Sequence, residues 1–230
     1  MRAFAVTEEC ENNGAIVFAE RDIEARKWGA DEFNDGQLGG ITCVRAPWAD
    51  HLAGEPVPAK LMVENGWHFE CCGCGDRIDE DWLDDNDLPL DGVIGFQHGR
   101  IFCSEICQAR QNLEDAIKRD HERRAIEALK AYVLKRFPGV TFSNAREQWK
   151  PHAYAAERAG SWQVQQVVVS FEFPGMKIGA ATCRIERCQQ NEGFIGPIKP
   201  EYSCCSGDRE VFEAWAASPD SRRKPEVVAA

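Results

Sequence analysis

Two pairs of cysteines, 28 residues apart, constrain this chain more than any other feature of its sequence. Cys71 and Cys74 lie in "FECCGCGDR" with two residues between them, and Cys103 and Cys107 lie in "RIFCSEICQARQ" with three residues between them. A short turn can aim two sulfurs at one point, and four thiolates are a preferred ligand set of structural zinc. The spacing therefore predicts one tetrahedral zinc site formed by these four cysteines.

The residues around each pair favour the same interpretation. Gly73 and Gly75 allow a tight turn, because glycine tolerates a positive φ. The second pair is expected at the start of a helix, where backbone N–H groups favour thiolates. Four protein ligands leave no open position on the metal, so the predicted zinc is structural rather than catalytic.

Other assignments of the cysteines stay open at this point. The four could be buried or redox-active thiols without a metal, and His68 or His98 could replace one of them. Cys72 and Cys74 have only one residue between them, which makes a poor chelate turn, so a packed or exposed thiol is expected at Cys72.

A second group of cysteines makes a weaker pattern. Adjacent side chains in an extended chain point in opposite directions, so two neighbouring cysteines rarely bind one ion. Ordinary core or loop cysteines are the favoured interpretation, a second metal site is left open, and core positions are expected for Cys10 and Cys43. The group consists of Cys183, Cys188, Cys204 and Cys205.

Around these cysteines the sequence resembles a known family. "CCGCG" and "GRIFCSEIC" resemble treble-clef zinc fingers of the FCS, TRASH and MYM kind, in which a zinc knuckle is followed by a β-hairpin and an "FCS-x-x-C" helix start. The resemblance covers residues 71–75 and 99–107, under a fifth of the chain, and implies the same four ligands. More loosely, "GAIVFAERDIEARKWGA" and "GWHFECCGCG" look like small uncharacterised proteins of tailed bacteriophages and prophages, which implies a phage origin and no established activity.

The segment between the cysteine pairs is strongly acidic. In "DRIDEDWLDDNDLPLDG", eight acids against Arg77 give a net charge of −7, out of −11 for the whole chain. A loop held at both ends by zinc loses little freedom on binding. We therefore expect a partner-facing surface that engages a basic protein, in a phage setting a nucleic-acid-handling or defence protein of the host, with simple solubility as the alternative explanation. The candidate residues are Asp79, Glu80, Asp81, Asp84, Asp85 and Asp87.

Composition and motifs favour a binding protein over an enzyme. The chain has none of the patterns HExxH, GxSxG, GxxxxGK[ST] or GxGxxG. Its net charge of −11 disfavours general binding to phosphate backbones. A zinc-finger nucleic-acid binder remains the alternative, because residues 109–137 carry eight basic and five acidic side chains. The oligomeric state is left open.

The sequence also carries expectations about location. No stretch approaches the roughly 18 apolar residues of a membrane span, and the first residues lack a signal-peptide pattern. A cytoplasmic location is expected, in the bacterial host if the chain is phage encoded. Thiols stay reduced there, which favours metal ligands over disulfides.

We predict an α+β fold of small modules around the zinc site. The expected modules are an α/β module (1–66), a zinc module with an acidic insertion (67–118) and an α+β module (119–230). Strands at 2–6, 14–20 and 41–46 with a helix at 21–33 are expected in the first module. An antiparallel hairpin with strands at 163–173 and 176–186, and a helix at 208–218, are expected in the last. In the first strand of this hairpin, Val167, Val169, Phe171 and Phe173 are expected to share one face.

A long connecting helix is expected over residues 104–137, with two apolar stripes about half a turn apart. Such a change of face predicts that the helix passes from one module to the next. The first stripe is Ile106, Ala109, Leu113 and Ile117, and the second is Ile126, Leu129, Val133 and Phe137.

Overall fold

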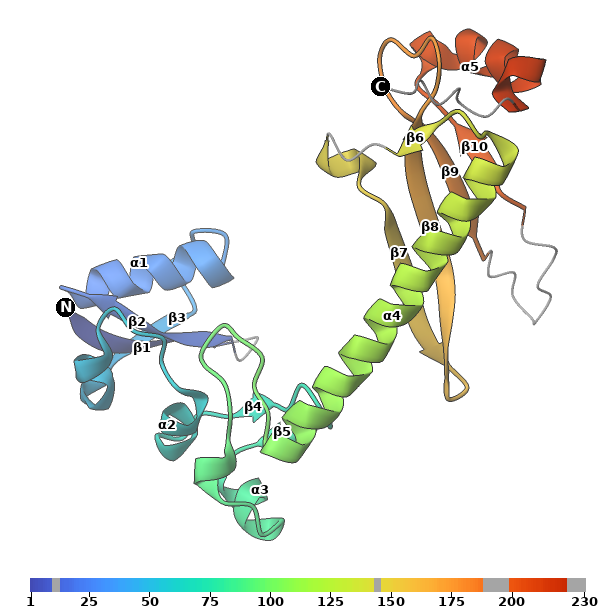
Figure 1. Cartoon of the computed structure of the whole chain (residues 1–230). Helices are drawn as coiled ribbons and strands as arrows, with labels where there is room; N and C mark the ends of the chain where they lie inside the picture. Colours follow the sequence, from blue (N-terminus) through green and yellow to red (C-terminus); the bar gives the residue numbers. More distant parts are fainter. Residues whose placement is uncertain (10–12, 143–145, 188–198, 223–230) are drawn as a thin grey trace, which may run out of the picture. The chain divides into compact units, whose positions relative to one another are not determined.

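The computed structural model describes residues 1–9, 13–142, 146–187 and 199–222 (Figure 1). The chain forms two compact units, Met1–Leu113 and Glu114–Ala230, and each is described by itself. Both are mixtures of helices and antiparallel sheets, as expected, and a long helix, α4 (Glu105–Arg136), runs from one into the other. The finer division into modules 1–66, 67–118 and 119–230 stays a prediction.

The first unit begins with a three-stranded antiparallel sheet in the order β2-β1-β3. The alternation of its apolar residues explains the arrangement, because Phe4 and Val6 point to one face and Ala3 to the other. Helix α1 packs on the Phe4 and Val6 face through Ala25 and Ala30 (Figure 1). The elements are β1 (Arg2–Glu8), β2 (Gly14–Ala19), α1 (Asp22–Phe33) and β3 (Ile41–Arg45), as the sequence predicts.

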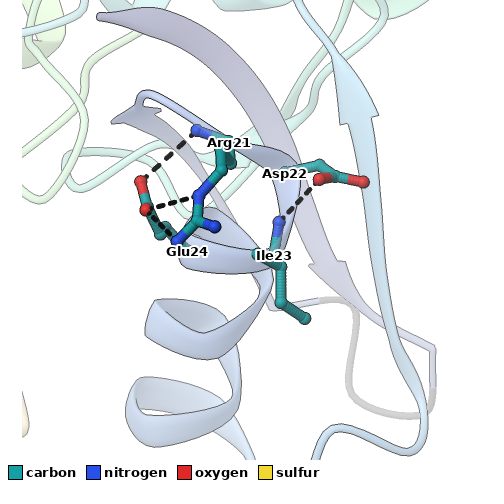
Figure 2. A network of polar contacts seen from close by, with 4 residues as sticks. All are labelled: Arg21, Asp22, Ile23 and Glu24. Atoms are coloured by element: carbon teal, nitrogen blue, oxygen red, sulfur yellow. Dashed lines mark hydrogen bonds and ion pairs between the residues drawn. The ribbon is translucent and has the colours of Figure 1, made fainter.

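The first turn of α1 is held by its own charged residues. Figure 2 shows the Glu24 carboxylate accepting from the Arg21 backbone N–H at 3.3 Å and from its guanidinium at 2.8 and 2.7 Å. The guanidinium lowers the pKa of Glu24. Because backbone N–H groups at a helix start lack partners within the helix, these contacts fix where α1 begins.

The rest of the first unit packs against the other face of the sheet and around the cysteine pairs. Gln97 ties the two parts together, because its side chain accepts from the Ile16 N–H at 2.6 Å and donates to the Ile16 carbonyl at 3.0 Å. The short elements here are the 3₁₀ turn Pro47–Leu52, α2 (Ala59–Glu64), β4 (Phe69–Glu70), β5 (Arg77–Ile78), α3 (Glu80–Asp85) and the 3₁₀ turn Leu90–Gly92.

The second unit is built on an antiparallel sheet in the order β10-β9-β8-β6, with β7 also paired to β8 (Figure 1). The predicted apolar face is confirmed as a buried face, because Val167, Val169 and Phe171 of β8 and Phe173 directly after it are all buried. Its elements are β6 (Thr141–Phe142), β7 (His152–Arg158), β8 (Ser161–Glu172), β9 (Ala181–Glu186), β10 (Glu201–Ser203), α5 (Arg209–Ala217) and the 3₁₀ turns Glu147–Trp149, Ser206–Asp208 and Pro219–Arg222.

The C-terminal half of α4 completes the core of the second unit. Leu129, Val133 and Phe137 are 2%, 0% and 3% exposed, and they pack on the sheet and on α5. Phe137 contacts the rings of Phe171, Phe212 and Trp215 among others. The second predicted stripe is therefore confirmed as a buried face.

The first predicted stripe of α4 is wrong as a buried face. Ile106, Leu113 and Ile117 are 80%, 62% and 38% exposed, and Ala109 is exposed as well. Periodicity identifies side chains that share one side of a helix, but burial requires an element facing that side. No described element covers these four residues.

None of the helices in the described residues has the length and apolar character needed to cross a bilayer.

Candidate metal centre

The structure brings the four predicted cysteines to one point. The sulfur of Cys103 lies 3.6 Å from that of Cys71, 3.8 Å from that of Cys74 and 3.4 Å from that of Cys107. All four sulfurs lie within 4.8 Å of one another. These separations are far longer than a disulfide bond of about 2.05 Å. Four thiols gathered in this way could hold a metal ion.

The first pair lies on a turn between two short strands. β4 and β5 are antiparallel, with Glu70 opposite Arg77, and the chain between them turns back through two backbone hydrogen bonds. The Cys71 N–H donates to the Asp76 carbonyl at 2.8 Å, and the Gly75 N–H donates to the Cys71 carbonyl at 2.9 Å. Gly75 has a φ of +80°, so the expected need for glycine is confirmed there.

The second pair lies at the start of α4. Cys103 is two residues before the helix begins, and Cys107 is in its first turn. The Cys72 N–H donates to the Ile101 carbonyl at 2.8 Å, which ties the two pairs together. Gly73 packs so closely on the helix that a Cβ there would lie 2.9 Å from the Cys107 carbonyl oxygen.

The sulfurs differ in how readily they ionise. Burial opposes ionisation of Cys71, but the backbone N–H groups of Cys74, Cys103 and Gly73 donate to its sulfur and bring its pKa down to about 7. Burial and the neighbouring sulfurs raise the pKa of Cys74, and they raise that of Cys103 to about 11. By itself the cluster therefore favours a thiolate at Cys71, whereas a divalent cation among the sulfurs would favour ionisation of all the cysteines that bind it.

The positions of the histidines and of Cys72 show which residues lie with the four cysteines. Neither His68 nor His98 belongs to the cluster, and the His98 ring instead contacts Gln97 at 2.7 Å and packs near Trp28. Cys72 is exposed and outside the cluster, as expected. Cys43 is half-buried beside the core of the first sheet rather than within it, and Cys10 lies outside the described residues.

The second cysteine group forms no cluster in the part of the chain that the structure describes. Cys183 is fully buried in the sheet of the second unit, and burial raises its pKa to about 11. Cys204 and Cys205 are half-buried, and Cys188 lies outside the described residues.

The acidic segment is more ordered than the loop expected from the sequence. It contains the short helix α3, whose Leu83 is 2% exposed in the core around the cysteines. The Asp79 carboxylate begins this helix by accepting from the Trp82 N–H at 2.9 Å, and it also pairs with Arg77. This acidic segment therefore forms a short helix, which Asp79 caps and whose Leu83 side chain packs in the core.

The six candidate acids therefore fall into two classes. Asp79 is half-buried and engaged in capping, and the Trp82 N–H and Arg77 lower its pKa against a smaller opposing effect of burial. The other five side chains are exposed on and beside α3. They are Glu80, Asp81, Asp84, Asp85 and Asp87.

Sequence reasoning missed one buried carboxylate. Asp208 is fully buried in the second unit, where it accepts from the N–H groups of Lys177, Ile178 and Gly179 at 3.0, 2.7 and 3.1 Å. The Cys205 thiol also donates to it, at 3.3 Å. Burial opposes its ionisation, yet these donors lower its pKa overall. The only sign of a structural role for Asp208 in the sequence was its position at the start of the predicted helix, directly before α5.

Comparison with models of known protein families, with curated proteins and with solved structures gave no match. The resemblance to treble-clef fingers and the origin in a tailed phage therefore stay predictions.

Proposed function

We propose that Cys71, Cys74, Cys103 and Cys107 bind one structural zinc ion, and that the resulting module is a non-enzymatic protein-binding element. The separations of their sulfurs carry this proposal. A tetrahedron with Zn–S bonds of about 2.3 Å has sulfur–sulfur edges of about 3.8 Å. The distances from Cys103, which are 3.6, 3.8 and 3.4 Å, are close to that edge.

A treble-clef arrangement around the zinc is supported by the local backbone. The turn at residues 71–75 corresponds to the zinc knuckle, and α4 corresponds to the helix that follows the hairpin. Between them, Ile94 and Phe102 form an antiparallel bridge with two reciprocal hydrogen bonds of 2.9 Å. This bridge is in the place where such fingers have their hairpin.

The partner surface in this proposal is the exposed acidic face of α3. Leu83 anchors the helix in the core around the cysteines, so the acids lie on a fixed element rather than a free loop. A pre-ordered acidic face loses little freedom on binding and attracts a basic partner. A basic protein of a bacterial host cell is the partner that we propose.

The metal proposal is tested by elemental analysis of the purified full-length protein. About one equivalent of zinc is expected, and iron in its place would contradict the metal assigned. Cys103→Ser should lose the zinc and lower the melting temperature, because binding energy at such a site is folding energy. Cys72→Ser is the matched control and should retain both.

The partner proposal is tested by capturing basic proteins from a bacterial lysate and measuring association rates with the one identified. Changing the five exposed acids to Asn or Gln should slow association at low salt, with a smaller difference at high salt. The zinc content should not change. Equal association rates of the wild type and the variant at low salt would show that the acidic face of α3 does not contact the partner.

A second candidate function is nucleic-acid binding through the basic residues of α4. Its ion pairs argue against a free basic face, because Arg123 and Arg124 both pair with Asp120 on the same helix. An electrophoretic shift with DNA and RNA at two salt concentrations separates the candidates. Tight binding that falls steeply with salt would favour nucleic acid.

A further inference from the structure

A cleft of about 300 Å³ lies in the second unit, between α4 and the sheet. Most of the side chains that line it are apolar, and they come from α4, β8 and β9. Small-molecule sites commonly combine an apolar lining with a few placed polar groups. The apolar side chains include Ala125, Leu129, Tyr132, Val164 and Ile185.

One charged side chain faces this apolar lining. Arg187 is half-buried at the end of β9, beside a bulge in β8, where its backbone N–H donates to the Gln165 carbonyl at 2.8 Å. Arg187 also lines a second, more polar hollow of about 590 Å³, so it borders both hollows.

The guanidinium of Arg187 has a neutral partner, the Gln163 side-chain oxygen, at 2.8 Å. Within the described residues no carboxylate pairs with it. The nearest acid in sequence, Glu186, pairs with Arg184 instead. Because no carboxylate among the described residues neutralises this half-buried guanidinium, a bound anion could form charge-assisted hydrogen bonds with it.

We propose that this cleft binds a small amphipathic carboxylate. Its apolar chain would lie between α4 and the sheet, and its carboxylate would accept hydrogen bonds from Arg187. A volume of about 300 Å³ holds roughly ten water-sized groups, which matches a medium-chain fatty acid such as octanoate. The proposed site is separate from the metal centre and does not depend on it.

The test is calorimetric titration of the full-length protein with octanoate and, as a neutral analogue, 1-octanol. The wild type should bind octanoate with a Kd below about 1 mM. Arg187→Gln should weaken octanoate binding at least about tenfold and leave octanol unchanged, because only the charge-assisted hydrogen bonds are lost. Ala128→Phe should weaken both ligands, since Ala128 lines the cleft and is exposed, so the larger ring fits without entering the core.

Arg209→Gln is the matched control. It removes the same charge from an exposed residue of α5 that pairs with Glu213 and lines neither hollow, so both ligands should bind as they do to the wild type. Equal losses of octanoate binding in Arg187→Gln and Arg209→Gln would overturn the proposal. No octanoate binding by the wild type, together with self-association that Ala128→Phe abolishes, would also overturn it and assign the cleft to a second copy of the chain.

Discussion

Gly73, in the turn at residues 71–75, lies against the first turn of α4. The space for a side chain there is filled by the backbone of Cys107, which cannot move without shifting a ligand. The requirement for glycine at this position is therefore steric, whereas at Gly75 it comes from the positive φ.

Gly73→Ala should weaken metal binding by at least about tenfold, because the added methyl group would push the two cysteine pairs apart. Competition with a zinc chelator measures the affinity. Gly39→Ala is the control, since a Cβ at Gly39 meets no atom within 4 Å. Equal affinities for the two variants would mean that the turn at residues 71–75 and the start of α4 can move apart without loss of the metal site.

Asp208 holds the chain at residues 177–179 against the start of α5. Because its pKa in the folded protein is lowered, its contribution to stability is complete above the unfolded value of about 3.9. That contribution is lost as the pH falls through the folded value.

Asp208→Asn should lower the melting temperature by several degrees at neutral pH, because an amide replaces one accepting oxygen with a donor. The difference from the wild type should be constant from about pH 8 to pH 5 and should narrow below about pH 4. Calorimetry across this range tests the sign. A difference that grows as the pH falls would contradict the assignment of an ionised carboxylate.

At the scale of the element, α4 has two halves with different roles. Its C-terminal half is a core helix of the second unit, whereas the apolar side chains of its N-terminal half are exposed. In α4, apolar residues of the N-terminal half are exposed. In helix α3, by contrast, a mostly acidic segment contains one buried apolar residue, Leu83.

The two halves of α4 should respond differently to the same substitution. Leu129→Asp should destabilise the second unit by more than about 3 kcal/mol, since it places an uncompensated charge at a site that is 2% exposed. Ile117→Asp should cost less than about 1 kcal/mol, because that position is 38% exposed. Denaturant unfolding measures both, and a large loss for Ile117→Asp would show that a partner element covers the stripe.

At the scale of the whole molecule, the two units depend on different sources of stability. The first surrounds the cysteine cluster, with Cys71 and Cys103 buried in its core. The second has an aromatic core around Phe137, Phe171 and Phe212. Only the first should need a metal.

Removing the metal with a strong chelator should lower the unfolding transition of residues 1–113 and leave that of 114–230 unchanged, since structural zinc sites contribute directly to folding. Hydrogen exchange followed by mass spectrometry assigns each change to a unit. Added zinc should restore the first unit. Loss of protection in both units would mean that they fold as one.

The sequence by itself determined the features that depend on local chemistry. The spacing of the cysteines predicted the four side chains that meet, because a short turn and the first turn of a helix each bring two sulfurs to one side. Alternation of apolar residues predicted the inward face of β8 and the strands of the first sheet.

Only the tertiary structure decided what lies across from each side chain. Periodicity could not show that one stripe of α4 is covered and the other is exposed, because that depends on a distant sheet. The burial of Asp208 depends on residues 177–179, which lie 29 to 31 positions earlier in the chain. The same holds for Arg187. It lines an apolar cleft that forms only when α4 packs on β8 and β9, and no carboxylate of the described residues lines that cleft.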